Sequence, residues 1–328
     1  MASIKVALLG FGTVGEGIYR ILNERKEEIK QQTGYLIDID SILVRDTAKK
    51  RLATPGIKIT DDIQEILSNP DIDFIFEAIV GEEPAYTYLS DAIEKGFNVI
   101  TANKKMFAKH GPALYKHAEF RGVQLGYEAT TAGGVPIIRT VTNLLPTDRV
   151  RRIQGILNGT SNFILTKMRE EGIPFKAALH EAQALGYAEA DPTDDVSGKD
   201  AFRKLMILSA LAFGKQPNWQ DIQVAGIDRV TIEDVAGAFK GKLRYRHIAE
   251  ISIDENGTLN GSVGPVLIGS AHPLYGVDGV DNAIIVETDY LGILTLVGPG
   301  AGMYPTASAM VGDFFQMIGK RERVLVNS

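Results

Sequence analysis

Along the first part of the chain, short apolar runs alternate with segments in which apolar residues recur at helical spacing. The runs predict buried strands, which are 4–9, 36–44, 74–80, 97–101 and one near Val123. The spaced segments predict helices, which are 13–32, 63–67, 84–95 and one that ends near Phe120. This alternation predicts an α/β domain, a doubly wound parallel sheet covered by helices on both faces.

The pattern changes after Pro136, where helices group apart from strands. The expected helices are 161–171, 175–185 and 199–213, and the expected strands are 150–157, 242–253, 262–268, 282–288 and 291–297. This grouping predicts an α+β domain with a mixed or antiparallel sheet. We therefore expect a first domain over 1–138 and a second over 139–305. A final amphipathic helix at 306–318 is expected to fold back with the segment 306–328 onto the first domain.

Composition narrows the classes of function. The absence of cysteine excludes disulfides, cysteine-ligated metals and cysteine nucleophiles. A net charge of −6 argues against general nucleic-acid binding. No apolar run approaches the ~18 residues of a membrane helix, and the N-terminus lacks a signal-peptide core. We expect a cytoplasmic protein whose partners are neither nucleic acid nor membrane.

A glycine-rich turn follows the first expected strand and opens the first expected helix. It comprises Gly10, Phe11, Gly12, Thr13, Val14 and Gly15. The glycines allow a tight turn, the approach of a pyrophosphate and close packing of the helix, whose N-terminus favours phosphate. The turn predicts a Rossmann-type dinucleotide-binding domain, although a purely structural turn is the alternative.

In such domains, residues at the end of the second strand contact the ribose of the cofactor. Arg45 there suits the 2′-phosphate of NADP(H), with help from the basic run 49–51, which could also be a solvated helix face. Asp46 could bind a ribose hydroxyl instead. NADP(H) is favoured, and NAD(H) stays open.

Lysines and carboxylates are the remaining candidates for chemistry. Lys104 stands at the carboxyl end of an expected parallel strand, where ligands of such sheets bind. Asp200 and Lys204 are four residues apart and share a helix face. An ordinary surface ion pair is the alternative for these two, but the strongly apolar helix argues for burial. Glu189 and Asp195 belong to an acidic cluster that could receive a substrate ammonium or a cation, or serve as helix N-terminal charge.

Two polar loops complete the candidates. Asn158, Gly159 and Thr160 lie between a strand and a helix, where N–H groups and hydroxyls suit a carboxylate, although a plain helix cap is the alternative. Gly300 belongs to the glycine cluster 298–302, where backbone can pass close to a ligand.

Six segments in this order resemble the homoserine dehydrogenase family over almost the whole chain. They are GFGTVG at 10–15, TANKK at 101–105, YEATTAGGVPII at 127–138, GILNGTSNFIL at 155–165, ALGYAEADPTDDVSGKDAFRKL at 184–205 and GPGAGMYPTASA at 298–309. The resemblance implies reversible NAD(P)H-dependent reduction of L-aspartate 4-semialdehyde to L-homoserine. It also implies a homodimer formed through the second, substrate-binding domain.

The resemblance assigns roles to individual positions. Lys204 falls on the general acid/base, and Lys104 on a lysine near nicotinamide and substrate. Contacts to substrate are expected from Glu189, Asp200, Asp195, Asn158, Gly159, Thr160 and Tyr187, and further contacts to cofactor from Gly186 and Gly300. A monovalent cation, Na⁺ or K⁺, would bind Glu128 and the carbonyls of Thr131, Gly133 and Val135. Thr131 replaces an apolar residue of many members, which a carbonyl ligand tolerates.

The chain departs from many bacterial members, which continue into a regulatory module. We expect a short form without threonine feedback through such a module, and without a preceding kinase domain. Two other functions compete with this interpretation. One is a nicotinamide enzyme for another small amino or keto acid, and the other is a cofactor sensor without turnover, which the acid–lysine set argues against.

Overall fold

The structure is a computed structural model that describes residues 3–51, 53 and 55–326, with side chains described as far as residue 319. The chain divides into two units, Met1–Gly133 with Gly302–Ser328 and Gly134–Ala301. Residues 1, 2, 327 and 328 of the expected domain boundaries lie outside the described residues. Within the described part, no helix is long and apolar enough to cross a membrane.

The first unit contains a six-stranded sheet in the order β3-β2-β1-β4-β5-β6, in which every described pair is parallel. Its strands are β1 (Ser3–Leu9), β2 (Leu36–Leu43), β3 (Lys58–Thr60), β4 (Phe74–Glu77), β5 (Asn98–Thr101) and β6 (Leu125–Gly126). Its helices are α1 (Thr13–Glu24), α2 (Lys26–Thr33), α3 (Ile63–Leu67), α4 (Ala85–Glu94), α5 (Lys104–Arg121), the 3-10 turn η1 (Glu128–Thr130) and α12 (Met303–Val326). The predicted Rossmann-type fold is confirmed.

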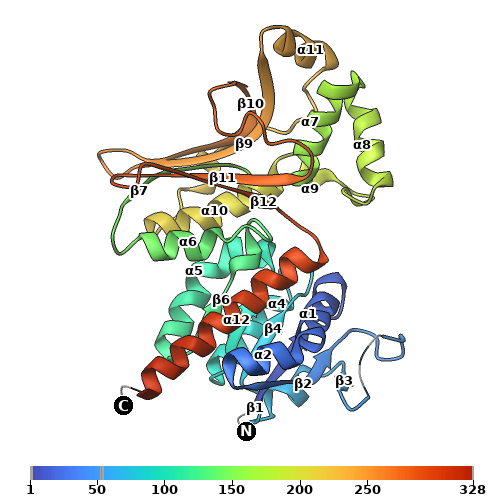
Figure 1. Cartoon of the computed structure of the whole chain (residues 1–328), viewed down its shortest axis with the longest axis vertical. Coiled ribbons are helices and arrows are strands. Elements are labelled where there is room, and N and C mark those ends of the chain that lie inside the picture. The colour runs from blue at the N-terminus through green and yellow to red at the C-terminus, as the bar shows by residue number, and fades with distance from the viewer. Residues whose placement is uncertain (1–2, 52, 54, 327–328) are drawn as a thin grey trace. The chain divides into compact units, whose positions relative to one another are not determined.

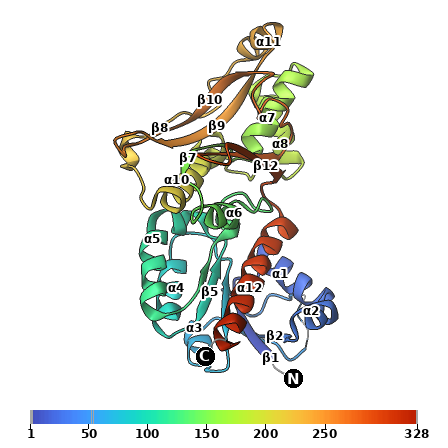
Figure 2. The same cartoon turned by 60° about the vertical axis from the view of Figure 1, so that its left-hand side comes forward.

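Helices cover both faces of this sheet, as Figures 1 and 2 show, with α4 and α5 on one side and α1 and α12 on the other. The C-terminal helix α12 completes the core, because Phe314 packs against Phe74 and Phe76 with ring centroids 4.9 and 5.5 Å apart. Gly17 of α1 lets this helix approach closely, since a Cβ there would lie 2.9 Å from Met303. Burying these rings contributes on the order of 2–3 kcal/mol each.

The second unit contains a mixed sheet in the order β12-β11-β7-β9-β10-β8. Its strands are β7 (Val150–Ile156), β8 (Gln223–Val224), β9 (Leu243–Ile253), β10 (Leu259–Gly269), β11 (Asp281–Thr288) and β12 (Ile293–Pro299). Its helices are α6 (Ile137–Leu144), α7 (Gly159–Glu171), α8 (Phe175–Ala184), α9 (Thr193–Val196), α10 (Lys199–Phe213), the 3-10 turn η2 (Trp219–Asp221) and α11 (Ile232–Lys240). Helix α10 packs against β7 and β9, and α7 packs against β9 and β11 and begins just after the end of β7. The predicted α+β architecture is confirmed.

Several local expectations were wrong or incomplete. The single helix expected at 13–32 is interrupted at Arg25, where α1 ends and α2 begins. Helices α6, α9 and α11 and the short strands β3 and β8 were not expected. The sequence carries a signal for α11, because Thr231 and Asp234 form a capping box that satisfies two backbone N–H groups.

Candidate functional site

The glycine-rich turn has the geometry of a phosphate cradle. Gly10 has φ +97°, and a Cβ there would lie 2.9 Å from the Ala78 carbonyl oxygen. A Cβ at Gly15 would lie 2.2 Å from the Gly10 oxygen, so only glycine lets α1 begin this close to the turn. A Cβ at Gly12 would meet nothing within 4 Å, and no side chain caps α1 at this residue. The open space and the uncapped first turn, Thr13 to Gly15, fit a pyrophosphate.

Arg45 and Asp46 are exposed just beyond the end of β2. The Asp46 side chain accepts a hydrogen bond from the Ala48 N–H at 2.9 Å, which shapes the loop. This places Arg45 at the carboxyl edge of the sheet, next to the strand that leads into the glycine turn. The arrangement can hold a negative group on the ribose of a bound dinucleotide.

A buried network joins the carboxyl ends of β4 and β5. The Glu77 carboxylate is fully buried and accepts hydrogen bonds from the Ile79 N–H at 2.6 Å and the Thr101 hydroxyl at 2.5 Å. Asn103 caps α5 by accepting from the Met106 N–H, and its amide donates to the Ile79 and Gly81 carbonyls at 3.0 and 2.6 Å. Together these bonds fix the two segments that leave the sheet beside the glycine turn.

Burial raises the pKa of Glu77 to about 7, because desolvation outweighs the hydrogen bonds from Thr101, Ile79 and Asn103. Lys104 directly follows this network as the half-buried first residue of α5, whereas Lys105 is exposed. The structure therefore places Lys104 at the predicted edge of the sheet, on a rigid helix terminus.

In the second unit, Asn158 connects several of the predicted residues. Its Oδ1 caps α7 by accepting from the Ser161 N–H at 2.8 Å. Its Nδ2 donates to Asp195 at 2.7 Å and to Asp200 at 3.0 Å. Because every polar atom of the Asn158 amide is used, the start of α7 is fixed relative to both carboxylates.

Lys204 and Asp200 form a buried ion pair on one face of α10. The Lys204 Nζ lies 2.9 Å from Asp200 Oδ2 and donates to the Leu157 carbonyl oxygen at 2.6 Å. The exposed fractions are 5% for Lys204 and 3% for Asp200, so the pair is not the solvated surface contact that was the alternative. Removing either partner would leave the other charge buried without its counter-ion, which is strongly unfavourable.

The segment 186–189 is more exposed. Gly186 has φ +77°, the Tyr187 carbonyl accepts from the Thr160 hydroxyl at 2.7 Å, and the Tyr187 ring packs edge-on against Phe163. The Glu189 side chain is exposed, and its backbone carbonyl accepts from Gln183 at 3.2 Å. Thr160 therefore joins this segment to α7, while the Glu189 carboxylate lies outside the buried network.

Two of the predicted glycines have packing reasons of their own. A Cβ at Gly159 would lie 2.5 Å from the Val280 carbonyl oxygen, so α7 begins with glycine because a loop passes over it. A Cβ at Gly300 would lie 2.1 Å from the side-chain amide carbon of Asn282. These contacts explain both glycines without a ligand, and they link 298–302 to the start of β11.

The expected cation ligands begin at η1. Glu128 is 1% exposed, and its N–H donates to the Asp313 carboxylate at 2.8 Å. The Thr131 hydroxyl is buried without a hydrogen-bond partner among the described residues, and Gly133 has φ +53°. Val135 follows in the second unit and is buried. The buried Glu128 carboxylate and the unsatisfied Thr131 hydroxyl, three positions apart in the chain, fit a cation that takes few side-chain ligands. Within the described residues, no three His, Cys, Asp or Glu side chains gather as a metal site.

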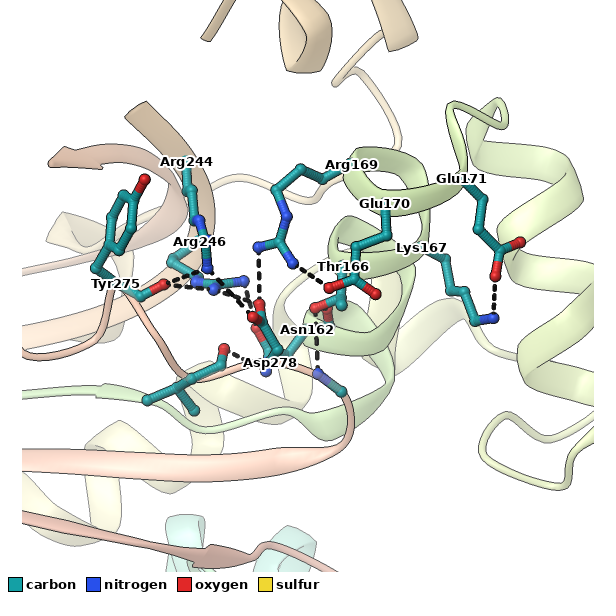
Figure 3. Close-up of polar contacts among 12 residues, drawn as sticks. Asn162, Thr166, Lys167, Arg169, Glu170, Glu171, Arg244, Arg246, Tyr275 and Asp278 are labelled. Atoms are coloured by element: carbon teal, nitrogen blue, oxygen red, sulfur yellow. Dashed lines mark hydrogen bonds and ion pairs between the residues drawn. The ribbon is translucent and has the colours of Figure 1, made fainter. Parts of the chain in front are cut away.

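An arginine cluster in the second unit was not predicted. Figure 3 shows Arg169 of α7 and Arg244 and Arg246 of β9 converging on the Asp278 carboxylate. The distances from their guanidinium nitrogens to Asp278 are 2.8, 3.2 and 2.6 Å, and Arg246 is fully buried. Desolvation raises the pKa of Asp278, but Arg169 and Arg246 outweigh it and hold that pKa below its ordinary value. The cluster clamps the loop before β11 onto α7 and β9.

Sequence analysis missed two buried polar residues, Glu77 and Asn282, and the partly buried Asp278. The expected strand 74–80 was taken as fully apolar, yet it contains Glu77, and an acid within such a run is itself a signal. Asn282 and Asp278 carry no such signal, because Leu157 lies 125 positions from Asn282 and the three arginines lie 32 to 109 positions from Asp278.

Known proteins are similar to this chain over nearly its full length. Two family models match, "Homoserine dehydrogenase" over 136–315 and "Homoserine dehydrogenase, NAD binding domain" over 10–128. The homoserine dehydrogenase of Bacillus subtilis is 40% identical over 315 residues, which cover 95% of this chain and 72% of that protein. A crystal structure of a homoserine dehydrogenase from Thiobacillus denitrificans aligns with a TM-score of 0.92 at 40% identity, covering 97% of this chain and 74% of that one. A hyperthermophilic archaeal homoserine dehydrogenase in complex with NADPH aligns with a TM-score of 0.82 at 28% identity, covering 97% and 98%.

Proposed function

Because the chain belongs to the homoserine dehydrogenase family, we propose that Lys204 is the general acid and base of its reaction and that Asp200 orients it. The chain is an NAD(P)-dependent oxidoreductase that reversibly reduces L-aspartate 4-semialdehyde to L-homoserine, in the biosynthesis of threonine and methionine. The family assignment sets aside the amino-acid dehydrogenase and the sensor. The observation that carries the proposal is the buried Asp200–Lys204 pair beside the Leu157 carbonyl.

Lys204 is suited to both directions of the reaction. Bound NAD(P)H supplies the hydride that turns the aldehyde carbonyl into an alkoxide. The Lys204 ammonium stabilises the negative charge on that oxygen and then gives it a proton. In the oxidising direction, a neutral Lys204 amine takes the proton from the homoserine hydroxyl. Since a free lysine has a pKa of ~10.4, we expect homoserine oxidation to rise as pH increases above neutrality.

The charged ends of the substrate need partners of opposite charge. We assign its ammonium to Glu189 and Asp200, and its carboxylate to the Asn158–Thr160 backbone at the start of α7. Asp195 supports this site through Asn158, and Tyr187 through its bond with Thr160.

The cofactor binds the first unit, and we propose NADP(H) as the preferred form, with NAD(H) also used. The support is the cradle 10–15, in which Gly12 faces open space, and the exposed Arg45 beyond β2. A relative solved in complex with NADPH agrees with this preference. Lys104, Gly186 and Gly300 are the further residues we assign to cofactor binding, Lys104 also as a catalytic group.

The proposal also includes a bound cation and a homodimer. A monovalent cation is held by Glu128 and the carbonyls of Thr131, Gly133 and Val135, supported by the unsatisfied Thr131 hydroxyl. A second copy of the chain covers the exposed apolar side chains of the second sheet, since Ile293 and Val297 on one face of β12 are 60% and 55% exposed. We place this homodimer in the cytoplasm.

The test is absorbance at 340 nm with L-homoserine and either NADP⁺ or NAD⁺, for the wild type and for Lys204→Ala. We expect turnover by the wild type, faster with NADP⁺, that collapses in the variant. A wild-type rate that stays flat from about pH 7 to 10 while chemistry limits turnover would contradict the role of Lys204.

A further inference from the structure

The Leu157 carbonyl, just after β7, accepts hydrogen bonds from two side chains. One is the Lys204 ammonium at 2.6 Å, and the other is the Asn282 amide at 3.1 Å. Asn282 is the second residue of β11 and has no exposed surface. Both donors therefore lie within hydrogen-bond distance of one oxygen, deep in the second unit.

The Asn282 side chain is also confined by the backbone at Gly300. A Cβ at Gly300 would lie 2.1 to 2.3 Å from the carbon, oxygen and nitrogen of the Asn282 amide, so the side chain fills the space left by that glycine. Its Oδ1 is buried and has no hydrogen-bond partner in the described part of the chain. A buried polar atom without a partner is unfavourable. An apolar residue at this position would avoid the unsatisfied oxygen, but it could not donate the hydrogen bond that the Asn282 amide gives to the Leu157 carbonyl.

The backbone before Asn282 is held by separate contacts. The Asn162 amide donates to the Val277 and Asp281 carbonyls at 3.1 and 3.4 Å, and the Gly279 N–H donates to Thr166 at 3.2 Å. The arginine cluster of Figure 3 fixes Asp278 in the same loop. The start of β11 is thus anchored to α7 independently of the Asn282 side chain. Because its own strand is held without it, the Asn282 side chain is available to act on Leu157.

We infer that Asn282 is a positioning residue for Lys204, acting through the Leu157 carbonyl. A carbonyl oxygen has two lone pairs, and the Asn282 amide occupies one of them. This confines the Lys204 ammonium to the other, while Asp200 fixes a second N–H of the same group. With two N–H directions fixed, the tetrahedral geometry of the ammonium fixes the third as well, which sets the position from which Lys204 transfers a proton. The inference rests on the proposed acid and base role of Lys204.

The charges around this group are Asp200 on α10, Asp195 through Asn158, and His247 on β9. Burial lowers the pKa of His247, so its imidazole stays neutral near neutral pH. Asn282 adds no charge. A carboxylate in its place would favour the charged form of Lys204, so homoserine oxidation would require a higher pH.

The experiment compares Asn282→Ala and Asn282→Asp with Asn256→Asp, a matched control in the exposed turn between β9 and β10. We expect Asn282→Ala to lower kcat about 10- to 100-fold, with the KM for NADP⁺ within about twofold of wild type, because a misdirected ammonium slows proton transfer. We expect Asn282→Asp to move the pH profile of homoserine oxidation upward by about one unit. The control should match the wild type in both.

Alanine removes atoms without adding any, so this variant is expected to fold even if the aspartate variant does not. An unchanged kcat in Asn282→Ala overturns the inference. So does a fall in kcat that accompanies an equal fall in thermal stability while the pH profile of Asn282→Asp stays in place. Lys204→Ala is measured alongside. If Lys204→Ala keeps its activity, the proposed acid and base role of Lys204 is wrong. This result is distinct from an unchanged kcat in Asn282→Ala alone, which contradicts only the role of Asn282.

Discussion

A buried carboxylate lies at the centre of each polar network, but the two carboxylates have different partners. Glu77 in the first unit accepts hydrogen bonds from a hydroxyl and a backbone amide. Asp200 in the second unit is paired with the Lys204 ammonium at 2.9 Å and with the Asn158 amide. The same chemical group therefore has neutral partners in one unit and a cation in the other.

The difference separates two uses of a buried acid. Neutral donors compensate only part of the desolvation of Glu77, so its pKa rises to about 7 and the group serves to hold backbone segments. The ammonium beside Asp200 carries a proton that it can give to a reacting group, which a general acid needs. The first network braces the segments beside the glycine turn, and the second contains the lysine that we propose as acid and base.

Lys204→Ala should produce the largest effect. It removes the proton donor and leaves Asp200 buried without its cation. We expect kcat to fall about 10²- to 10⁴-fold and the free energy of unfolding to fall by about 3–5 kcal/mol. Steady-state kinetics and urea denaturation measure the two losses. Lys199→Ala, at an exposed position on the same helix, should change neither. Near-wild-type turnover in Lys204→Ala would contradict the difference in use that we propose for the two buried carboxylates.

Glu77→Gln tests the other carboxylate through pH. The pKa of about 7 in the folded chain lies above the ordinary 4.5, so the folded protein binds this proton more tightly than the unfolded chain. Wild-type stability is therefore lost as pH rises from about 4.5 to 7, and the loss is complete above that window. Glutamine does not titrate. Relative to wild type, the variant should gain about 2–3 kcal/mol between about pH 5 and 8.

Urea denaturation at a series of pH values measures this gain. Glu65→Gln is the matched control, because hydrogen bonds from Thr60 and Lys58 lower the pKa of that exposed carboxyl. Its difference from wild type should stay nearly constant over the same range. A parallel pair of curves for Glu77→Gln and wild type would mean that Glu77 keeps its charge, and the contrast with Asp200 would disappear.

Gly15→Ala and Gly12→Ala separate packing from binding within one turn. A Cβ at Gly15 would lie 2.2 Å from the Gly10 oxygen, so we expect a loss of about 1–3 kcal/mol in the free energy of unfolding. A Cβ at Gly12 meets nothing within 4 Å, so that variant should keep its melting temperature and bind the dinucleotide less tightly. Thermal melts and cofactor titrations measure both. Unchanged dinucleotide binding by Gly12→Ala would show that the open space at Gly12 is not a ligand cradle.

Local patterns predicted the features that depend on local spacing. The alternation of periods predicted the parallel sheet, and the four-residue spacing placed Asp200 and Lys204 on one helix face. The same spacing could not distinguish a buried pair from a surface pair, because burial depends on β7 and β9, which pack against α10. The apolar sequence of α10 was the only local indication.

Long-range contacts account for what was missed. Asn282 acts on Leu157 across 125 positions, and Asp278 meets Arg169 across 109. No window of sequence contains both partners, and neither asparagine nor aspartate at a strand or loop boundary is unusual. Glu77 was different, since an acid inside an apolar strand could have been recognised before its partners were known.

Arg45→Ala should have the smallest effect, and it tests whether the cofactor side uses charge at all. Arg45 is exposed at the end of β2, where it can pair with a 2′-phosphate but not contribute to a buried network. Because solvent weakens such a contact, we expect kcat/KM for NADP⁺ to fall about two- to fivefold, with the value for NAD⁺ nearly unchanged. Steady-state kinetics with both cofactors measure the ratio. Arg25→Ala, an exposed arginine paired with Glu28, is the control. An equal loss with both cofactors would assign the preference to a residue other than Arg45.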